Sequence, residues 1–267
     1  MQDILQEIVA HKRIEVARQK EAVTPTVLHR QVEELLATAT APHSMRQSLA
    51  QSASGIIAEF KRKSPSKGWI KEDGLPDIIP PAYAHHGAAA LSILTDEHYF
   101  GGSLRFLQKA RPLVGSCPIL RKDFIIDEYQ LFQAKVVGAD AVLLIAADLT
   151  KDECRQLAQT AHQLQLETLL EVHTEAELDY LSDHIDMVGV NNRNLGTFHT
   201  DVQNSFRLSA QLPQDYLLVS ESGISQPQTV RQLREAGFRG FLIGETFMRT
   251  PDPGQALQTF IQQVTAP

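Results

Sequence analysis

The sequence is poor in cysteine, in positive charge and in long apolar runs. Its 267 residues include only 2 cysteines, Cys117 and Cys154, so a disulfide framework is excluded and a reducing, cytoplasmic location is expected. The 25 Lys and Arg residues are outnumbered by 32 Asp and Glu residues, and the resulting formal charge of -7 disfavours binding to a nucleic-acid backbone. The apolar stretches 88–94 and 141–147 are far shorter than the roughly 18 residues that cross a bilayer. We therefore expect neither a nucleic-acid nor a membrane partner.

Several motifs that carry chemistry are absent as well. The 10 histidines form no His-Glu-x-x-His pattern and the cysteines form no paired motif, so no metal site is expected. His11 and His173 are predicted to be surface or capping residues. The segment 64–68 lacks the spacing of a P-loop, no Gly-x-Gly-x-x-Gly follows the first apolar run, and no Gly-x-Ser-x-Gly elbow occurs. These absences disfavour a metalloenzyme, a dinucleotide-binding fold and a serine hydrolase.

What the sequence does contain is a regular alternation of two kinds of segment. Short β-branched apolar runs alternate with longer amphipathic segments from residue 56 onward, which is typical of β/α units around a buried parallel sheet. The eight predicted strands are 56–60, 89–95, 119–124, 141–147, 168–172, 187–191, 217–222 and 240–244. Predicted helices include 128–137, 151–163, 175–181, 227–235 and 253–261. Eight units over about 200 residues predict an α/β fold, a closed (β/α)8 TIM barrel, as a single domain over residues 1–267.

The first 50 residues stand apart from this pattern. Apolar residues such as Ile4, Ile8, Val32 and Leu36 recur there at helical spacing, so residues 1–50 are predicted to form a helical N-terminal extension. This extension would either plug or buttress one end of the barrel, or take a direct part in the site.

Polar side chains end five of the predicted strands. Glu59 and Lys61 share one face of the first strand, and Lys122, Glu171, Asn191 and Glu221 end four others. Since barrel enzymes place their active sites at the C-terminal ends of the strands, these residues are candidates for catalysis. A layer of structural salt bridges is the alternative. Gly223 follows strand seven and Gly244 ends strand eight, where barrels bind phosphate, and the two predict an anion site.

Five segments together resemble the indole-3-glycerol phosphate synthase family over nearly the whole chain. They are 57–66 (Ile-Ala-Glu-Phe-Lys-Arg-Lys-Ser-Pro-Ser), 120–124, 170–173, 189–195 and 220–224. The resemblance implies a tryptophan-pathway reaction in which 1-(2-carboxyphenylamino)-1-deoxyribulose 5-phosphate closes to indole-3-glycerol phosphate with loss of carbon dioxide and water. It implies a small-molecule phosphorylated substrate, general acid–base catalysis, and no cofactor or metal.

The resemblance also implies roles for individual residues. Lys122 is implied as the general acid of ring closure, with Glu171 and Asn191 holding the geometry around it. Lys61 would bind the substrate carboxylate, Glu59 would act as a base, and Glu221 would orient the lysines. The full implied catalytic set is Glu59, Lys61, Lys122, Glu171, Asn191, Glu221 and Ser222. The implied substrate-binding set is Ser64, Phe100, Phe124, Leu143, Arg193, Gly223, Gly244 and Glu245.

Two departures from the family pattern carry expectations of their own. Pro80 and Pro81 fall where the first barrel helix is expected, so this helix should start late or kink. Glu245 occupies a place often held by Ser, so its carboxylate should point away from the phosphate and leave only its N–H to bind the phosphate.

Two alternative functions remain open: another phosphate-binding barrel enzyme, such as an isomerase or Schiff-base aldolase, and a non-catalytic metabolite-binding barrel.

Overall fold

The N-terminal extension is helical, as predicted. The computed structural model describes residues 4–38, 43–194, 199–213 and 215–266, so Leu195 of the sequence motif lies outside the described residues. Three helices precede the first strand: α1 (Ile4–Ala22), α2 (Pro25–Thr38) and α3 (Met45–Gln51).

Eight parallel strands close into a barrel, which confirms the predicted (β/α)8 fold. The barrel closes because β1 pairs in parallel both with β10, at Ile56 and Phe241, and with β4, at Ile57 and Ala90. A small antiparallel hairpin of β2 (Lys63–Ser64) and β3 (Gly68–Trp69) follows β1. The barrel strands are β1 (Ile56–Phe60), β4 (Ala90–Leu94), β5 (Ile119–Lys122), β6 (Ala141–Ile145), β7 (Glu167–Val172), β8 (Met187–Asn191), β9 (Leu217–Glu221) and β10 (Gly240–Ile243).

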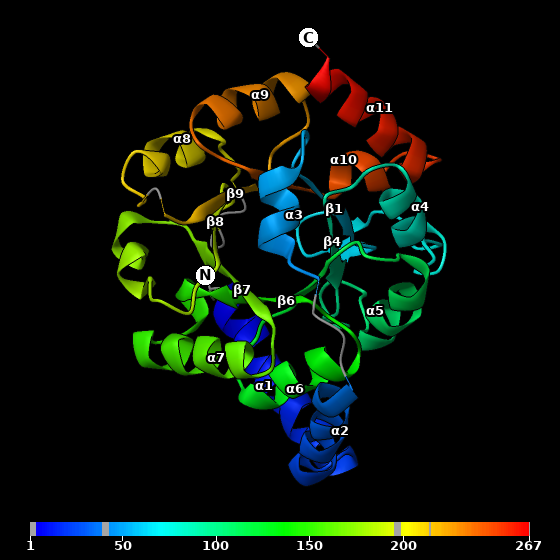
Figure 1. The fold of residues 1–267 in the computed structure, drawn as a ribbon, viewed down its shortest axis with the longest axis vertical. Helices are drawn as coiled ribbons and strands as arrows, with labels where there is room; N and C mark the ends of the chain where they lie inside the picture. The colour runs from blue at the N-terminus through cyan, green and yellow to red at the C-terminus, as the bar shows by residue number, and fades with distance from the viewer. Residues whose placement is uncertain (1–3, 39–42, 195–198, 214, 267) are drawn as a thin grey trace.

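A ring of helices surrounds the strands (Figure 1). The predicted helix 175–181 is instead the 3-10 helix η3 (Glu175–Tyr180), of which no side chain is fully buried and only Leu178 and Tyr180 pack partly against the core. It therefore has less of the packing that stabilises longer α-helices. The remaining helices are α4 (Ile79–His85), α5 (Leu104–Ala110), η1 (Arg111–Leu113), α6 (Glu128–Val136), η2 (Ala146–Asp148), α7 (Lys151–Gln163), α8 (Gln203–Ser209), α9 (Pro227–Glu235), α10 (Glu245–Met248) and α11 (Pro253–Thr265).

Local sequence explains where several of these helices begin. Asp127 and Thr150 form capping boxes at the starts of α6 and α7, in which side chains satisfy backbone N–H groups that have no helical partner. Pro80 and Pro81 lie in the first turn of α4, where a missing N–H costs no helical hydrogen bond. Helix α4 thus begins directly before the two prolines, which keeps both of them out of its interior.

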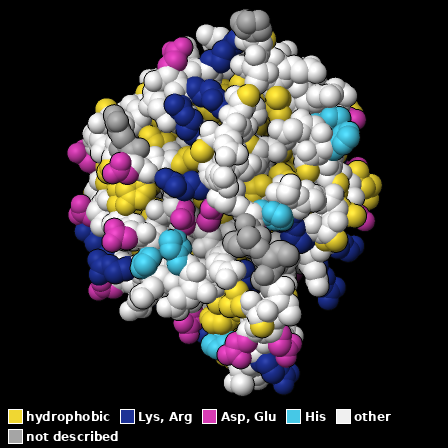
Figure 2. Space-filling model, viewed as in Figure 1, with side chains coloured by type: hydrophobic (Ala, Val, Ile, Leu, Met, Phe, Trp, Pro, Cys, Tyr) yellow, Lys and Arg dark blue, Asp and Glu magenta, His cyan; other side chains and the backbone are white. Residues whose placement is uncertain are grey.

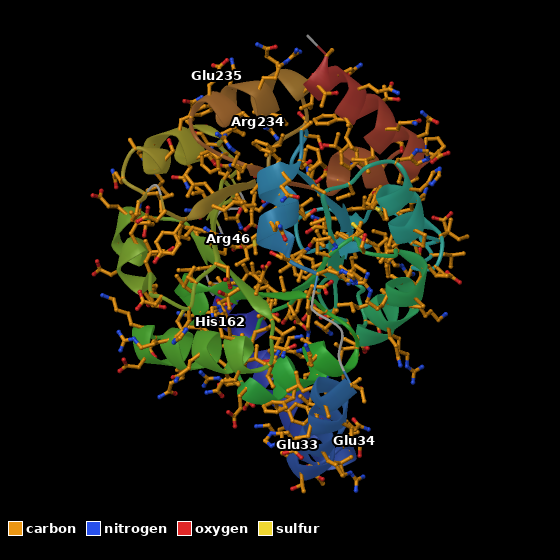
Figure 3. All side chains as sticks on the ribbon, viewed as in Figure 1. Glu33, Glu34, Arg46, His162, Arg234 and Glu235 are labelled. Carbon is orange, nitrogen blue, oxygen red and sulfur yellow. The ribbon has the colours of Figure 1, made fainter. Side chains whose placement is uncertain are left out.

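The extension covers both ends of the barrel. Met45 and Leu49 of α3 are fully buried in the same cluster as barrel residues such as Val219, at the end where the strands begin. Figure 1 shows α3 across the barrel axis on this face. Arg234 of α9, labelled in Figure 3, donates to the carbonyl of Ser52 just after α3, over 2.9 Å.

Helix α2 projects from the barrel on the same side as α1. In Figure 2 acidic and basic side chains lie together on this helix, where Figure 3 labels Glu33 and Glu34. Among the described helices, none combines the length and the apolarity that a membrane span requires.

Candidate active site

The C-terminal strand ends surround a cavity of about 720 Å³. Its volume lies within the range of about 300 to 1,000 Å³ that is usual for small-molecule sites. All of the site residues expected from the sequence line this cavity: Glu59, Lys61, Ser64, Phe100, Lys122, Phe124, Leu143, Glu171, Asn191, Arg193, Glu221, Ser222, Gly223, Gly244 and Glu245.

A four-membered layer of charged side chains forms the floor of the cavity. Its members, Glu59, Lys122, Glu171 and Glu221, come from β1, β5, β7 and β9. These are alternate strands around the barrel, and alternate strands contribute side chains to the same interior layer. Strand alternation therefore explains why residues far apart in the sequence meet here.

Lys122 is the centre of this layer. Its Nζ lies 2.9 Å from Glu171 Oε2 and 2.6 Å from Glu221 Oε2. Asn191 Nδ2 donates to the other oxygen of Glu171, Oε1, over 3.0 Å. In turn the Arg193 N–H donates to Asn191 Oδ1 over 3.0 Å, so the amide is fixed at both of its ends. The ammonium is thus held in one position by two buried carboxylates.

The two carboxylates differ in their proton affinity. Burial alone would raise the pKa of Glu171, but Lys122 and His173 outweigh burial and hold this pKa at about 2. At Glu221, burial dominates and raises the pKa to about 7, with Lys122 opposing the shift and Glu171 adding to it. Burial would lower the pKa of Lys122, yet the neighbouring carboxylates raise it above its ordinary value. Near neutral pH, Lys122 is an ammonium and Glu221 is the group poised to titrate.

A second ion pair lies at the end of β1. Lys61 Nζ is 2.6 Å from Glu59 Oε1, and the Lys61 side chain is 18% exposed, so the pair faces the cavity. A Cβ on Gly244 would stand 2.5 Å from the same Glu59 oxygen. Only glycine therefore leaves room for the Glu59 carboxylate. The site thus holds two lysines, each against an acidic partner.

The loops after β9 and β10 offer backbone groups to an anion. Ser222 and Gly223 adopt left-handed φ values of 67° and 78°, which place a tight turn directly after β9. Gly244 precedes α10, and the Glu245 carboxylate pairs with Arg249 Nη2 at 2.7 Å. This pairing engages the carboxylate within the helix, and the role of the Glu245 N–H toward a phosphate stays a prediction.

Hydroxyl groups from the β1 loop complete this end of the cavity. Ser64 Oγ is buried and, within the described part of the chain, makes no hydrogen bond. Ser66 Oγ accepts a hydrogen bond of 2.7 Å from Arg193 Nη1. Both serines line the cavity, so both hydroxyls are placed to meet a bound group.

An apolar wall faces the charged layer. The Phe100 and Phe124 rings have centroids 6.0 Å apart, and they join Leu143. Ile4 and Ile8 of α1 extend this wall. A purely supporting role for the extension is therefore wrong: α3 covers one end of the barrel, whereas α1 contributes directly to the site. Sequence reasoning missed these residues because helical spacing does not show which surface a helix covers.

A buried lysine anchors α1 above the strand ends. Lys12 Nζ lies 2.8 Å from Asp96 Oδ2 and 2.9 Å from Asp123 Oδ1, and the Lys12 side chain is fully buried. Asp96 and Asp123 follow β4 and β5, and Asp123 is next to Lys122. The anchor therefore ties the apolar wall to the strand that carries the central ammonium.

The two histidines that were predicted as surface or capping residues are both partly buried. His173 is 12% exposed, with Nε2 3.4 Å from Glu171 Oε1, because the residue directly follows β7 at the mouth of the barrel. His11 is half-buried and stacks on His98 with ring centroids 4.5 Å apart. Among the described side chains, no three His, Cys, Asp or Glu residues gather as a metal site.

A closed barrel with acid–base pairs at its strand ends, an apolar wall and an anion site defines a (β/α)8 enzyme that acts on a small molecule. The family model described as "Indole-3-glycerol phosphate synthase" matches residues 5–260. The chain belongs to the indole-3-glycerol phosphate synthase family.

Curated relatives agree with this family. An indole-3-glycerol phosphate synthase from Bacteroides thetaiotaomicron is 62% identical over 264 residues, covering 99% of this chain and all of the relative. Another, from Polaromonas sp., is 44% identical and covers 96% of this chain and 97% of its own length. A solved 3-hexulose-6-phosphate synthase from Salmonella typhimurium has a TM-score of 0.63 at 11% identity, covering 79% of this chain and 98% of its own, and shares the fold alone.

Proposed function

We propose that this chain closes the indole ring of indole-3-glycerol phosphate from 1-(2-carboxyphenylamino)-1-deoxyribulose 5-phosphate, a carboxy-lyase reaction of tryptophan biosynthesis. The observation that carries the proposal is Lys122, an ammonium held between two carboxylates and facing the same cavity as the Lys61–Glu59 pair. Membership of the family and the relative at 62% identity support the same activity.

The cavity can hold such a substrate in one orientation. Its aromatic ring would lie against Phe100, Phe124 and Leu143, which form the apolar wall. Its phosphate would bind at the opposite side, where backbone N–H groups after β9 and β10 favour an anion. The groups proposed there are Ser64, Ser222, Gly223, Gly244, the N–H of Glu245, and the side chain of Arg193.

Ring closure then requires an acid at the ketone oxygen. As the aromatic carbon attacks the ketone carbon, the Lys122 ammonium donates a proton to the developing alkoxide, which becomes a hydroxyl. The neighbouring carboxylates raise the pKa of Lys122, so the proton is present at neutral pH. Glu171 and Asn191 hold the ammonium in place, and Glu221 orients it. Loss of carbon dioxide returns its electron pair to the ring.

Dehydration uses the ion pair of Lys61 and Glu59. Lys61, which binds the carboxylate of the substrate, is proposed to protonate the departing hydroxyl. Glu59 removes a proton from the adjacent methylene carbon, so water leaves and the indole double bond forms. The Glu59–Lys61 separation of 2.6 Å allows the two groups to exchange the proton afterwards. Side chains of the protein alone supply these proton transfers.

The alternatives make different predictions. In a Schiff-base aldolase a lysine forms an imine with the substrate, so borohydride would trap a covalent adduct. Lys122 is instead an ammonium with a raised pKa, a poor nucleophile, which favours a general acid. A non-catalytic barrel needs no acid–base layer, and the comparisons favour the synthase.

The setting of the enzyme is also part of the proposal. Cys117 and Cys154 are free thiols, which supports a reducing, cytoplasmic location. We propose that residues 1–267 act as a single domain without a nucleic-acid partner.

The direct test is a continuous fluorescence assay for indole product, with purified protein, the carboxyphenylamino substrate and a chelator. Product formation supports the synthase and excludes a loosely bound metal. If there is no turnover but the substrate still quenches the fluorescence of Trp69, the single tryptophan, the barrel binds without catalysis and the proposal is wrong.

A further inference from the structure

His173 is a buried histidine at the rim of the site for which the proposed steps have no use. Its ring stands between two carboxylates, with Nε2 3.4 Å from Glu171 Oε1 and Nδ1 3.5 Å from Glu177 Oε2. Within the described chain, neither ring nitrogen makes a hydrogen bond, so these contacts act through charge.

The backbone on either side of the ring is fixed. The His173 N–H donates to Glu177 Oε2 over 2.6 Å, and the His173 carbonyl accepts from Asn204 Nδ2 over 3.1 Å. The ring therefore has a defined place, supplied by η3 and α8 as well as by β7. A histidine held in this way presents its edge to the catalytic layer rather than to solvent.

The charges that face His173 come from several elements. Glu171 on β7, Glu177 on η3 and Glu221 on β9 all favour an imidazolium. Lys122 on β5 is the cation that pairs with the other oxygen of Glu171. Burial alone would lower the pKa of His173, but these carboxylates outweigh burial and raise it above its ordinary value. By reciprocity, the imidazolium favours the ionised forms of Glu171 and Glu221.

We propose that His173 is a positioning residue that holds Glu171 from the side opposite Lys122. In this position it keeps both carboxylates of the Glu171–Lys122–Glu221 cluster ionised. Glu171 Oε2 faces Lys122, whereas Oε1 faces both Asn191 and His173, so the carboxylate is clamped at both oxygens. The inference rests on the proposed function, because it assigns His173 to the mechanism through Lys122.

The first test compares pH profiles of His173→Gln and wild type. Since kcat/KM reports groups of the free enzyme, its acid limb should follow Glu221, whose pKa is about 7. In His173→Gln we expect the limb to move up, because the imidazolium no longer favours ionised Glu221. The shift should be smaller than the roughly 1 to 3 units caused by a cation next to a carboxylate, since His173 lies against Glu171 and Glu177. Glu177→Gln should shift it the same way by less, because His173 then holds its proton less firmly.

The matched control is His162→Gln. His162 on α7, labelled in Figure 3, pairs with Asp186 at 2.9 Å but is not part of the cavity wall. Its profile should superimpose on that of wild type. If the profiles of His173→Gln and Glu177→Gln also superimpose on wild type, the inference is overturned.

A readout that does not depend on turnover separates this inference from the proposed function. In an NMR titration of ¹⁵N-labelled histidine rings, we expect the pKa of His173 to lie above its ordinary value of about 6.5. The signal of His173 is assigned by its loss in His173→Gln. If that variant does not fold, the signal is assigned by its shift in Glu177→Gln. The pKa of His173 should fall in Glu171→Gln. A wild type without turnover contradicts the synthase proposal alone, whereas a His173 pKa at or below its ordinary value contradicts the role of His173.

Discussion

Replacing Gly189 by alanine should disable the enzyme without changing its fold. Gly189 lies on β8, and a Cβ there would overlap Glu221 Oε1 and stand 3.2 Å from Glu221 Cδ. Restoring an ordinary contact would move this carboxylate by about 1 Å. The 2.6 Å contact between Glu221 Oε2 and Lys122 would then open to about 3.6 Å, which is no longer a hydrogen bond.

The expected magnitude follows from that displacement. A misplacement of about 1 Å in a catalytic group costs on the order of 10²-fold in rate, or about 2.7 kcal/mol of transition-state stabilisation. Overpacking should also lower the free energy of unfolding by about 1 to 3 kcal/mol. Steady-state kinetics by the fluorescence assay and urea unfolding measure the two effects separately.

Gly240→Ala is the matched control for overpacking. Its Cβ would stand 2.8 Å from Val219 Cγ2 at the opposite end of the barrel, so it should lose stability but keep kcat. In the double variant with Glu221→Ala, the penalty on stability of Gly189→Ala should shrink, because the clashing carboxylate is gone. A folded Gly189→Ala enzyme with wild-type kcat would refute the reasoning.

Three further predictions concern the charges at the mouth of the barrel. Lys122→Ala should lower kcat by about 10² to 10⁴-fold with an unchanged circular dichroism spectrum, since a general acid is lost; near-normal turnover would contradict its assignment. Because the pKa of Glu221 is raised to about 7, its carboxylate takes up a proton as the pH falls below that value and no longer accepts from Lys122. The kcat/KM should therefore fall about tenfold per pH unit on the acid side, and a profile flat from pH 5 to 8 would argue against this cause. Lys12→Met should lower the free energy of unfolding by about 3 to 5 kcal/mol, measured in urea, because the buried Asp96 loses its ion-pair partner and Asp123 keeps, among the described residues, only its ion pair with Arg121.

Much of the barrel and its catalytic layer follows from short-range patterns. Strand β1 was predicted with its observed bounds, because four of its five residues are apolar and leave a strong local signal. Glu59, Lys122, Glu171 and Glu221 could be placed together because strand ends in a parallel barrel share one face. No structure is needed for that step once the strands are counted.

The remaining features depend on contacts between distant segments. The contact of Lys12 with Asp123 requires knowing which end of the barrel α1 covers, and the helical spacing of α1 is equally compatible with either end. His173 was predicted as a surface or capping residue, whereas its backbone is bound by Glu177 of η3 and Asn204 of α8, whose positions the sequence does not specify. The residues of η3 were predicted as an α-helix from their spacing, although none of them is buried.

The anchoring of α1 bears on the order in which the enzyme matures during synthesis. The helix leaves the ribosome before the barrel strands, but its lysine can contact Asp96 and Asp123 only after β4 and β5 have been made. The barrel itself closes when β10, which is made after the other seven strands, joins β1. Contacts between such distant segments carry a loop-closure cost and slow folding. A nascent chain stalled before β10 should therefore be inactive, and the appearance of activity would report the final closing step of folding.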